Sequence, residues 1–240
     1  MNTKHFKHIP ELPFAVAEAL NRLRVNVRFC GEDIRKIMVI SSVPNEGKSF
    51  ISINLWKLLA ESGEKCVFVD GDLRKSVIKE RYQLGGESDG EVKGISHYLS
   101  GHIALKDAIY HTDFPNADIV PLFTAVTNPS ILLESERFAE MLDELAKEYR
   151  YVIVDAAPLT AVADGERIAS LCDGALMVVR AGDTSRKLLQ RSIAQIERAG
   201  CPLIGVVLNR VEGKGSGYYS KYGRYGRYGK YGYGYGEYGK

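Results

Sequence analysis

Residues 37–49, with the sequence IMVISSVPNEGKS, constrain the fold of this chain more than any other stretch. The first four residues are apolar and rich in β-branched side chains, which is typical of a buried strand. The run breaks at two serines, and Gly47-Lys48-Ser49 leads into a helical pattern over residues 50–62. A tight loop between a strand and a helix N-terminus attracts anions through its backbone amides and the helix dipole. This order of elements therefore predicts a phosphate-binding loop.

The residue types in the loop fit a nucleoside triphosphate. Lys48 would reach the β- and γ-phosphates, and the Ser49 hydroxyl would bind Mg²⁺. The loop departs from the general pattern at Ser42, where a glycine six residues before the lysine is usual. The expected nucleotide contacts in and after the loop are Pro44, Asn45, Glu46, Gly47, Lys48, Ser49 and Phe50.

Two later apolar runs end in acidic residues. Residues 66–69 lead into Asp70-Gly71-Asp72, and residues 151–154 lead into Asp155. In an open parallel sheet, ligands bind at the carboxyl ends of the strands, and a strand-end aspartate often holds Mg²⁺ beside a phosphate loop. Taken alone, Asp70 and Asp72 are equally compatible with an acidic turn that caps a helix. Beside a phosphate loop, we favour a role in handling the metal and the nucleophile.

Strand-like and helix-like segments alternate along the chain. Further strands are expected at 119–123, 175–179 and 203–208, and helices at 13–29, 128–148 and 185–199. Alternation of this kind predicts an α/β fold of the P-loop NTPase type, a mostly parallel sheet with helices on both faces. Residues 1–12 are polar and expected to be loosely held, and the Gly-rich residues 83–94 to form a surface loop.

Composition separates a domain at residues 1–212 from a tail at residues 213–240. The chain has 240 residues and a net charge of +2, but the tail alone carries six Lys or Arg against one Glu. The domain is therefore slightly acidic, which argues against a basic nucleic-acid surface on it. Four scattered cysteines without a CxxC pair indicate core residues in a reducing compartment. We find no signal peptide and no apolar run of membrane-spanning length, so we expect membrane contact only through a partner.

The tail contains nine of the fourteen tyrosines, most of them followed by glycine. It lacks the aliphatic residues of a core, so we interpret it as flexible and disordered. Tyrosines between basic residues can stack on single-stranded nucleic acid, associate with each other, or accept phosphate. Composition does not choose among these functions.

Assembled, these features resemble the bacterial tyrosine kinases, in particular the separate cytoplasmic kinase subunit of capsule and exopolysaccharide systems. The resemblance covers about residues 14–210 and the tail, and rests mainly on Pro-x-Glu-Gly-Lys-Ser at 44–49 and Asp-x-Asp-Leu-Arg at 70–74. Further matching segments are residues 94–101, Asn128-Pro129-Ser130 with Leu132-Leu133, and residues 206–209.

The resemblance implies an ATP-dependent protein-tyrosine kinase that regulates capsule or exopolysaccharide synthesis, with ATP and Mg²⁺ as cofactors. The implied catalytic residues are Lys48, Asp70, Asp72 and Asp155. Ser49, Asp72 and Asp155 would hold the metal, and Asp70 would accept the tyrosine proton. Asn209 would contact the adenine.

The resemblance also implies partners. The tail would be phosphorylated in trans by a neighbouring copy, with the acceptors Tyr218, Tyr219, Tyr222, Tyr225, Tyr228, Tyr231, Tyr233, Tyr235 and Tyr238. The helix at 13–29 would form a ring-like homo-oligomer through Glu18, Arg22 and Arg24. A transmembrane activator would hold the cytoplasmic chain at the membrane, a cognate tyrosine phosphatase would reverse the reaction, and no nucleic acid would take part.

The chain departs from the family in three places. Asp155-Ala156-Ala157-Pro158 lacks a hydroxyl and a proline that are usual after the aspartate, Ser76 stands where proline is common, and Asn21 occupies a usual arginine position. One alternative is a switch ATPase similar to the chromosome- and septum-positioning ATPases. Those proteins use a second lysine five residues before the loop lysine, where this chain has Val43. A second alternative is a non-enzymatic module whose tail binds nucleic acid or polysaccharide.

Overall fold

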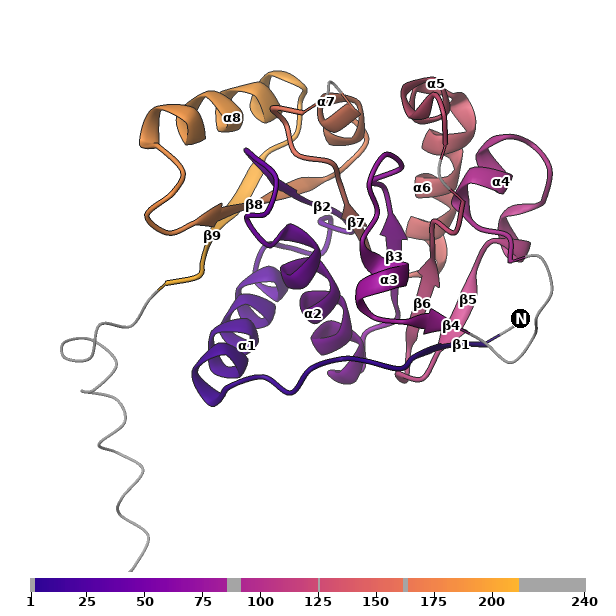
Figure 1. Ribbon diagram of the computed structural model, residues 1–240, viewed down its shortest axis with the longest axis horizontal. Helices are drawn as coiled ribbons and strands as arrows, with labels where there is room; N and C mark the ends of the chain where they lie inside the picture. Colours follow the sequence, from indigo (N-terminus) through magenta and orange to yellow (C-terminus); the bar gives the residue numbers. More distant parts are fainter. Residues whose placement is uncertain (1–2, 86–91, 125, 162–163, 212–240) are drawn as a thin grey trace, which may run out of the picture. The chain divides into compact units, whose positions relative to one another are not determined.

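The fold is built on a nine-stranded sheet in the order β4-β1-β5-β6-β3-β7-β2-β8-β9 (Figure 1). The computed structural model describes residues 3–85, 92–124, 126–161 and 164–211. The strands are β1 (Thr3–Phe6), β2 (Lys36–Ser41), β3 (Cys66–Asp70), β4 (Leu84–Gly85), β5 (Tyr110–Thr112), β6 (Ala117–Val120), β7 (Tyr151–Asp155), β8 (Gly174–Arg180) and β9 (Leu203–Asn209). The helices are α1 (Phe14–Arg28), α2 (Lys48–Glu61), α3 (Ile78–Arg81), α4 (Ile95–Leu99), α5 (Pro129–Glu134), α6 (Glu136–Glu148), α7 (Asp164–Ala169) and α8 (Arg186–Arg198), with a short 3-10 turn at Leu105–Asp107.

Six strands that are neighbours in the sheet, in the order β6-β3-β7-β2-β8-β9, pair in parallel. This arrangement confirms the predicted sheet type. Antiparallel pairing occurs between β5 and β6 and between β1 and β4, at the other side of the sheet. The register between β3 and β7 makes Asp70 and Asp155 direct partners. The parallel arrangement therefore brings two of the predicted acids to one edge of the sheet.

Helices cover both faces of the sheet, as predicted. One hydrophobic cluster joins strand residues such as Val39 and Phe68 to Trp56 of α2 and Val27 of α1. The other cluster joins alternate strand residues to Phe138 of α6, together with residues of α7 and α8. Apolar side chains on both faces of the central strands explain their unbroken hydrophobic runs.

The prediction that residues 1–12 are loosely held was wrong for residues 3–6, whereas residues 7–12 form no helix or strand. Thr3–Phe6 forms β1, which pairs with β5 on one side and β4 on the other. The Phe6 ring is 9% exposed and packs against Trp56, Tyr82 and Phe114. This one aromatic side chain supplies the burial that a count of polar residues did not anticipate.

Two other boundaries differ from expectation. The helix predicted over residues 128–148 is divided at Ser135, whose extended backbone ends α5 and precedes α6. The strand expected at 119–123 ends at Val120, because Pro121 lacks the N–H of a continuing ladder. The loop expected at 83–94 contains the two-residue β4, and its residues 86–91 lie outside the described residues.

The predicted tail of residues 213–240 also lies outside the described residues. Within the part of the chain that the structure describes, no helix is long and apolar enough to cross a bilayer.

Candidate active site

The phosphate loop joins the end of β2 to the start of α2, in the order that the sequence predicted. Gly47 precedes the helix with φ +97°, in the left-handed region that favours glycine. A Cβ atom at this position would lie 2.1 Å from Nδ2 of Asn209, so a larger residue would displace the Asn209 side chain. Lys48 and Ser49 are the first two residues of α2, at its positive end.

Lys48 makes two ion pairs with the predicted acids. Its Nζ atom lies 3.0 Å from Oδ2 of Asp72 and 3.8 Å from Oδ2 of Asp155. The three side chains are between 2% and 12% exposed, so solvent screens their charges weakly. Burial alone would lower the pKa of Lys48, but the charges of Asp155 and Asp72 outweigh it and raise the pKa above its usual value.

Asp155 is also held by hydroxyl groups of α2. Its Oδ1 accepts a hydrogen bond of 3.1 Å from Ser52, and the nearby Ser49 hydroxyl also favours the charged form of the carboxylate. Burial raises the pKa of Asp155, while Lys48 and the two hydroxyls oppose that shift. Ser52 was missed at the sequence level, although it stands one helical turn after Lys48 and therefore on the same face of α2.

Asp70 is the most deeply buried of the three acids, and its surroundings differ from those of Asp72 and Asp155. Its Oδ2 accepts hydrogen bonds from Ser76 Oγ at 2.5 Å and from the Leu122 backbone N–H at 3.4 Å. Its Oδ1 has no hydrogen-bond partner among the described residues. Burial raises the pKa of Asp70 to about 8, against the opposing effect of the Ser76 hydrogen bond.

Glu46 connects the phosphate loop to the segment after β8. The carboxylate is 1% exposed and accepts hydrogen bonds from the Val43 and Arg180 backbone N–H groups and from the Thr184 hydroxyl. The Asn209 side chain donates a hydrogen bond of 2.9 Å to the Glu46 carbonyl. The side chain of Glu46 thus braces the loop, and Asn209 lies against the loop backbone; the predicted adenine contact of Asn209 stays a prediction.

A second polar network surrounds Arg74, the last residue of the Asp-x-Asp-Leu-Arg motif. Its guanidinium binds both carboxylate oxygens of Asp164, at 2.7 and 3.3 Å, and the Ser130 hydroxyl at 2.7 Å. Ser130 also donates to Asp164. Ser130 therefore binds Arg74 of the Asp-x-Asp-Leu-Arg motif, a contact between distant segments that no spacing could predict.

The donor chemistry of the site suits magnesium. Asp72, Asp155 and Ser49 offer carboxylate and hydroxyl oxygens, the ligands that Mg²⁺ prefers. Within the described ranges, no three His, Cys, Asp or Glu side chains are arranged to hold a metal by themselves. A metal would therefore need phosphate oxygens and water to complete its coordination, which is common for Mg²⁺ beside nucleotides.

The predicted interface residues lie apart from this acidic centre, on α1. Glu18 and Arg22 are exposed, Arg24 is half-buried, and the helix packs against α2. The phenyl rings of Phe14 and Phe29 at the two ends of the helix are 82% and 84% exposed. An exposed face of this kind, with aromatic and charged residues, is compatible with the predicted contact between copies.

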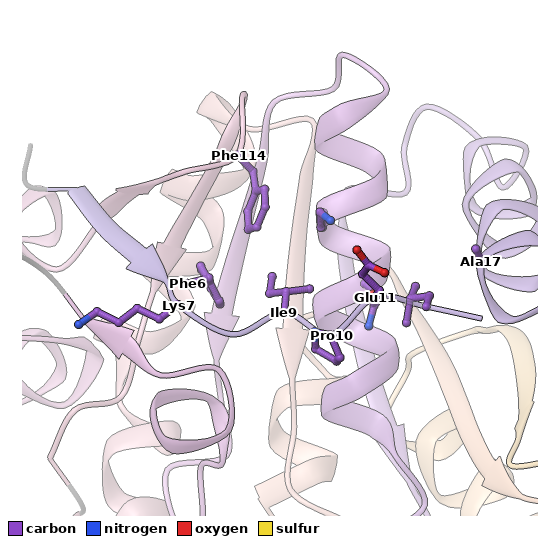
Figure 2. Close-up of a pocket in the computed structure, with 10 residues that line it drawn as sticks. Phe6, Lys7, Ile9, Pro10, Glu11, Ala17 and Phe114 are labelled. Atoms are coloured by element: carbon purple, nitrogen blue, oxygen red, sulfur yellow. The ribbon is translucent and has the colours of Figure 1, made fainter. Parts of the chain in front are cut away.

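A groove of about 640 Å³ lies between the N-terminal segment and α2, lined in part by Phe6, Ile9, Lys57 and Phe114. Figure 2 shows this segment crossing α2, with Ile9 and Pro10 beside the helix. Among the predicted site residues that the structure describes, none lines the groove, so it is separate from the acidic centre.

Comparisons with known proteins agree with the site. Residues 35–198 match a family described as an AAA domain. A tyrosine-protein kinase CpsD from Streptococcus agalactiae is 36% identical over 195 residues, which are 81% of this chain and 83% of the relative. The kinase domain of the Escherichia coli tyrosine kinase ETK superposes with a TM-score of 0.75 at 27% identity, covering 95% of this chain and 88% of that domain.

The septum site-determining protein MinD of Pyrococcus horikoshii, complexed with Mg-ADP, has a TM-score of 0.64 at 24% identity, covering 76% of this chain and 72% of that one. This likeness shows a shared fold and no more. The match to the named kinases extends over 81% of this chain. The chain accordingly belongs to the bacterial tyrosine-protein kinases.

Proposed function

We propose that this chain transfers the γ-phosphoryl group of Mg²⁺–ATP to tyrosines in the tail of a neighbouring copy. The observation that carries the proposal is the contact of Lys48 with both Asp72 and Asp155 at the start of α2. Phosphoryl transfer needs positioning and charge neutralisation more than covalent catalysis. A lysine, hydroxyls and several acids at a helix N-terminus supply both.

The phosphate loop and Lys48 would bind the triphosphate. The loop amides and the N-terminus of α2 favour negative charge, and Lys48 would move from the two acids to the β- and γ-phosphates. Ser49, Asp72 and Asp155 would hold Mg²⁺, whose charge neutralises the phosphate oxygens. The Asp72 and Asp155 carboxylates that now face the lysine would then face the metal or its water.

In the transfer step, the phenolic oxygen of a tyrosine forms a bond to the γ-phosphorus while the bond to the leaving ADP oxygen breaks with its electron pair. The phenolic proton would pass to Asp70, the third acid of the cluster. A group with a pKa near 8 is suited to accept a proton near neutral pH.

The tail is the proposed acceptor because nine tyrosines lie within residues 213–240. Tethered acceptors reach a high local concentration once copies assemble. We place that assembly on α1, through Glu18, Arg22 and Arg24. Each phosphate would add about 1.5–2 negative charges to a tail that starts basic, so phosphorylation would drive the copies apart.

The wider role that fits these features is regulation of capsule or exopolysaccharide synthesis. It rests on the similarity to the named tyrosine-protein kinases. We propose a transmembrane activator that holds the cytoplasmic kinase at the membrane, and a tyrosine phosphatase that restores the unphosphorylated tail.

Incubation of the purified chain with ATP and Mg²⁺ tests the proposal, with phosphotyrosine in the tail and free phosphate measured together. Lys48→Met should abolish tail phosphotyrosine without loss of the fold. The matched control is Lys57→Met, also on α2 but paired with Glu61 at the surface, and it should label normally. Unchanged labelling of Lys48→Met would reject this site, and release of phosphate without phosphotyrosine would favour the switch ATPase.

A further inference from the structure

Asp70 stands out among the three acids because it does not contact Lys48. In the described part of the chain, the Lys48 ammonium pairs with Asp72 and Asp155, and Asp70 makes no ion pair. The partners of Asp70 are instead a hydroxyl and a backbone amide, Ser76 Oγ and Leu122 N–H. Asp70 is thus oriented by hydrogen bonds rather than by a cation.

Both of these hydrogen bonds reach the same carboxylate oxygen. Oδ2 accepts from Ser76 at 2.5 Å and from Leu122 at 3.4 Å, while Oδ1 is buried without a partner among the described residues. A buried, unpaired carboxylate oxygen is unfavourable, because it has lost its hydration without gaining a hydrogen bond. Such an atom in a native structure calls for an explanation, for example a ligand or proton that it receives during function.

The direction of the Ser76 hydroxyl is determined by its other contact. Ser76 Oγ accepts a hydrogen bond of 3.2 Å from the Ile78 backbone N–H. Ile78 begins α3, and its side chain is 1% exposed, so the donor is anchored in the core. Because the Ser76 oxygen uses one lone pair to accept from Ile78, its single hydroxyl proton points towards Asp70.

We propose that Ser76 is a positioning residue for phosphoryl transfer, whose hydroxyl holds Oδ2 of Asp70 and leaves Oδ1 as the oxygen that receives the tyrosine proton. The inference rests on the proposed function, since it assigns Asp70 the role of proton acceptor. Ser76 does not touch the nucleotide in this account and acts only through Asp70. Removal of its hydroxyl frees the carboxylate to rotate, which misaligns the acceptor oxygen and slows the chemical step.

A matched pair of variants isolates the hydroxyl. Ser76→Thr keeps the donor and Ser76→Val replaces it by a methyl group of the same shape. We expect the initial rate of tail phosphorylation at saturating ATP to fall about 10–100-fold in Ser76→Val, a part of the 10²–10⁴ that proton transfer contributes. Ser76→Thr should stay within about threefold of the wild type, because its donor group is unchanged.

The apparent KM for ATP separates positioning from a structural role. If Ser76 acts through Asp70, kcat falls while the KM for ATP stays near that of Ser76→Thr. A modest drop in melting temperature is expected in Ser76→Val alone, because Asp70 and the Ile78 N–H each lose a hydrogen-bond partner. Ser62→Ala serves as a control, since the Ser62 hydroxyl donates to the Leu59 carbonyl at the far end of α2. That variant should have the wild-type kcat.

The Asp70→Asn variant distinguishes a failure of this inference from a failure of the proposed function. If Asp70→Asn is inactive and Ser76→Val has the kcat of Ser76→Thr, the role of Ser76 is overturned and that of Asp70 stands. If Asp70→Asn retains the wild-type kcat, Asp70 is not the proton acceptor, and both statements fail. A rise in the KM for ATP that accompanies the loss of kcat in Ser76→Val, absent from Ser76→Thr, would assign the hydroxyl to the general structure of the site and also overturn the inference.

Discussion

Lys48 Nζ lies 3.0 Å from Oδ2 of Asp72, and the same ammonium group lies 3.8 Å from Oδ2 of Asp155. One cation thus partly neutralises two buried acids where a triphosphate and a metal are expected. Nucleotide binding would exchange these ion pairs, because Lys48 moves to the phosphates while Mg²⁺ replaces it beside the acids. The arrangement keeps the acids paired until that exchange.

Replacement of Lys48 by methionine should therefore destabilise the nucleotide-free protein. The acids lose their counter-ion, and removing one partner of a buried pair costs about 3–5 kcal/mol. The loss should be largest near pH 8 and smaller near pH 5, because burial raises the pKa of Asp155 and protonation removes its charge. Urea unfolding at both pH values measures the free energy of unfolding.

Lys57→Met is the control for this measurement. The Lys57 side chain is 27% exposed and its ion pair with Glu61 joins residues four apart on one helix. Such pairs contribute only about 0.3–0.5 kcal/mol. If Lys57→Met lowers the free energy of unfolding as much as Lys48→Met does, the buried ion pairs of Lys48 contribute no more to stability than a surface pair.

Asp70→Asn should stabilise the protein, increasingly so as pH rises. The carboxyl group has a usual pKa of 3.8 and a pKa of about 8 when folded, so the native state binds more protons between these values. The stability of the wild type therefore declines from about pH 4 to pH 8 through this group, and asparagine removes the decline. The gain at pH 8 should exceed about 1 kcal/mol, because the carboxylate is then a buried charge whereas asparagine stays neutral.

Thermal unfolding of nucleotide-free protein in EDTA, at pH 5 and pH 8, checks this prediction. The difference in melting temperature between Asp70→Asn and the wild type should increase with pH. Asp183→Asn is the control, because the Asp183 side chain is 61% exposed and should give no such gain. A difference for Asp70→Asn that is constant or shrinks with pH would contradict the burial argument.

Much of the centre of the fold was predictable because its signals are local. The apolar runs before Ser41, Asp70 and Asp155 give buried strands, and parallel pairing requires their ends to meet at one edge. The phosphate loop is likewise local, since a glycine, a lysine and a serine in succession suffice to place it. The contact between Lys48 and the two acids follows from these facts.

The contacts that connect distant segments were not predictable. Arg74 binds Asp164, which lies ninety residues later in the chain, and Glu46 binds Thr184 across a separation of 138 residues. Neither pair has a periodic or compositional signal, because each depends on how loops pack after the sheet forms. The N-terminal strand was not predicted for a similar reason. Phe6 is buried by Trp56, a residue of another element.

Glu46→Gln should weaken ATP binding by loosening the phosphate loop. Three donors, from Val43, Arg180 and Thr184, point at the two carboxylate oxygens. The glutamine side chain has an NH₂ group in place of one carboxylate oxygen, so a donor would face a donor. The loss of that hydrogen bond costs about 1–3 kcal/mol.

Titration with a fluorescent ATP analogue, together with thermal unfolding, measures both effects. Thr184→Val removes only one of the three donors and should cost less, about 0.5–1.5 kcal/mol. Equal ATP affinities for Glu46→Gln, Thr184→Val and the wild type would mean that the hydrogen bonds of Glu46 do not affect nucleotide binding by the phosphate loop.

Phe6→Ala should unfold or strongly destabilise the side of the sheet that carries β1. The ring packs between Trp56 and Phe114, and truncation of a buried phenylalanine costs about 3–5 kcal/mol. Trp56 is the single tryptophan of the chain, so entry of water beside its indole appears as a red shift of the intrinsic fluorescence. Phe14→Ala is the matched control, because its ring is 82% exposed and its loss should change stability by less than about 0.5 kcal/mol. If both variants keep the wild-type emission maximum and unfolding midpoint, Phe6 does not anchor β1 against α2. The N-terminal residues would then be as loosely held as their polar composition predicted.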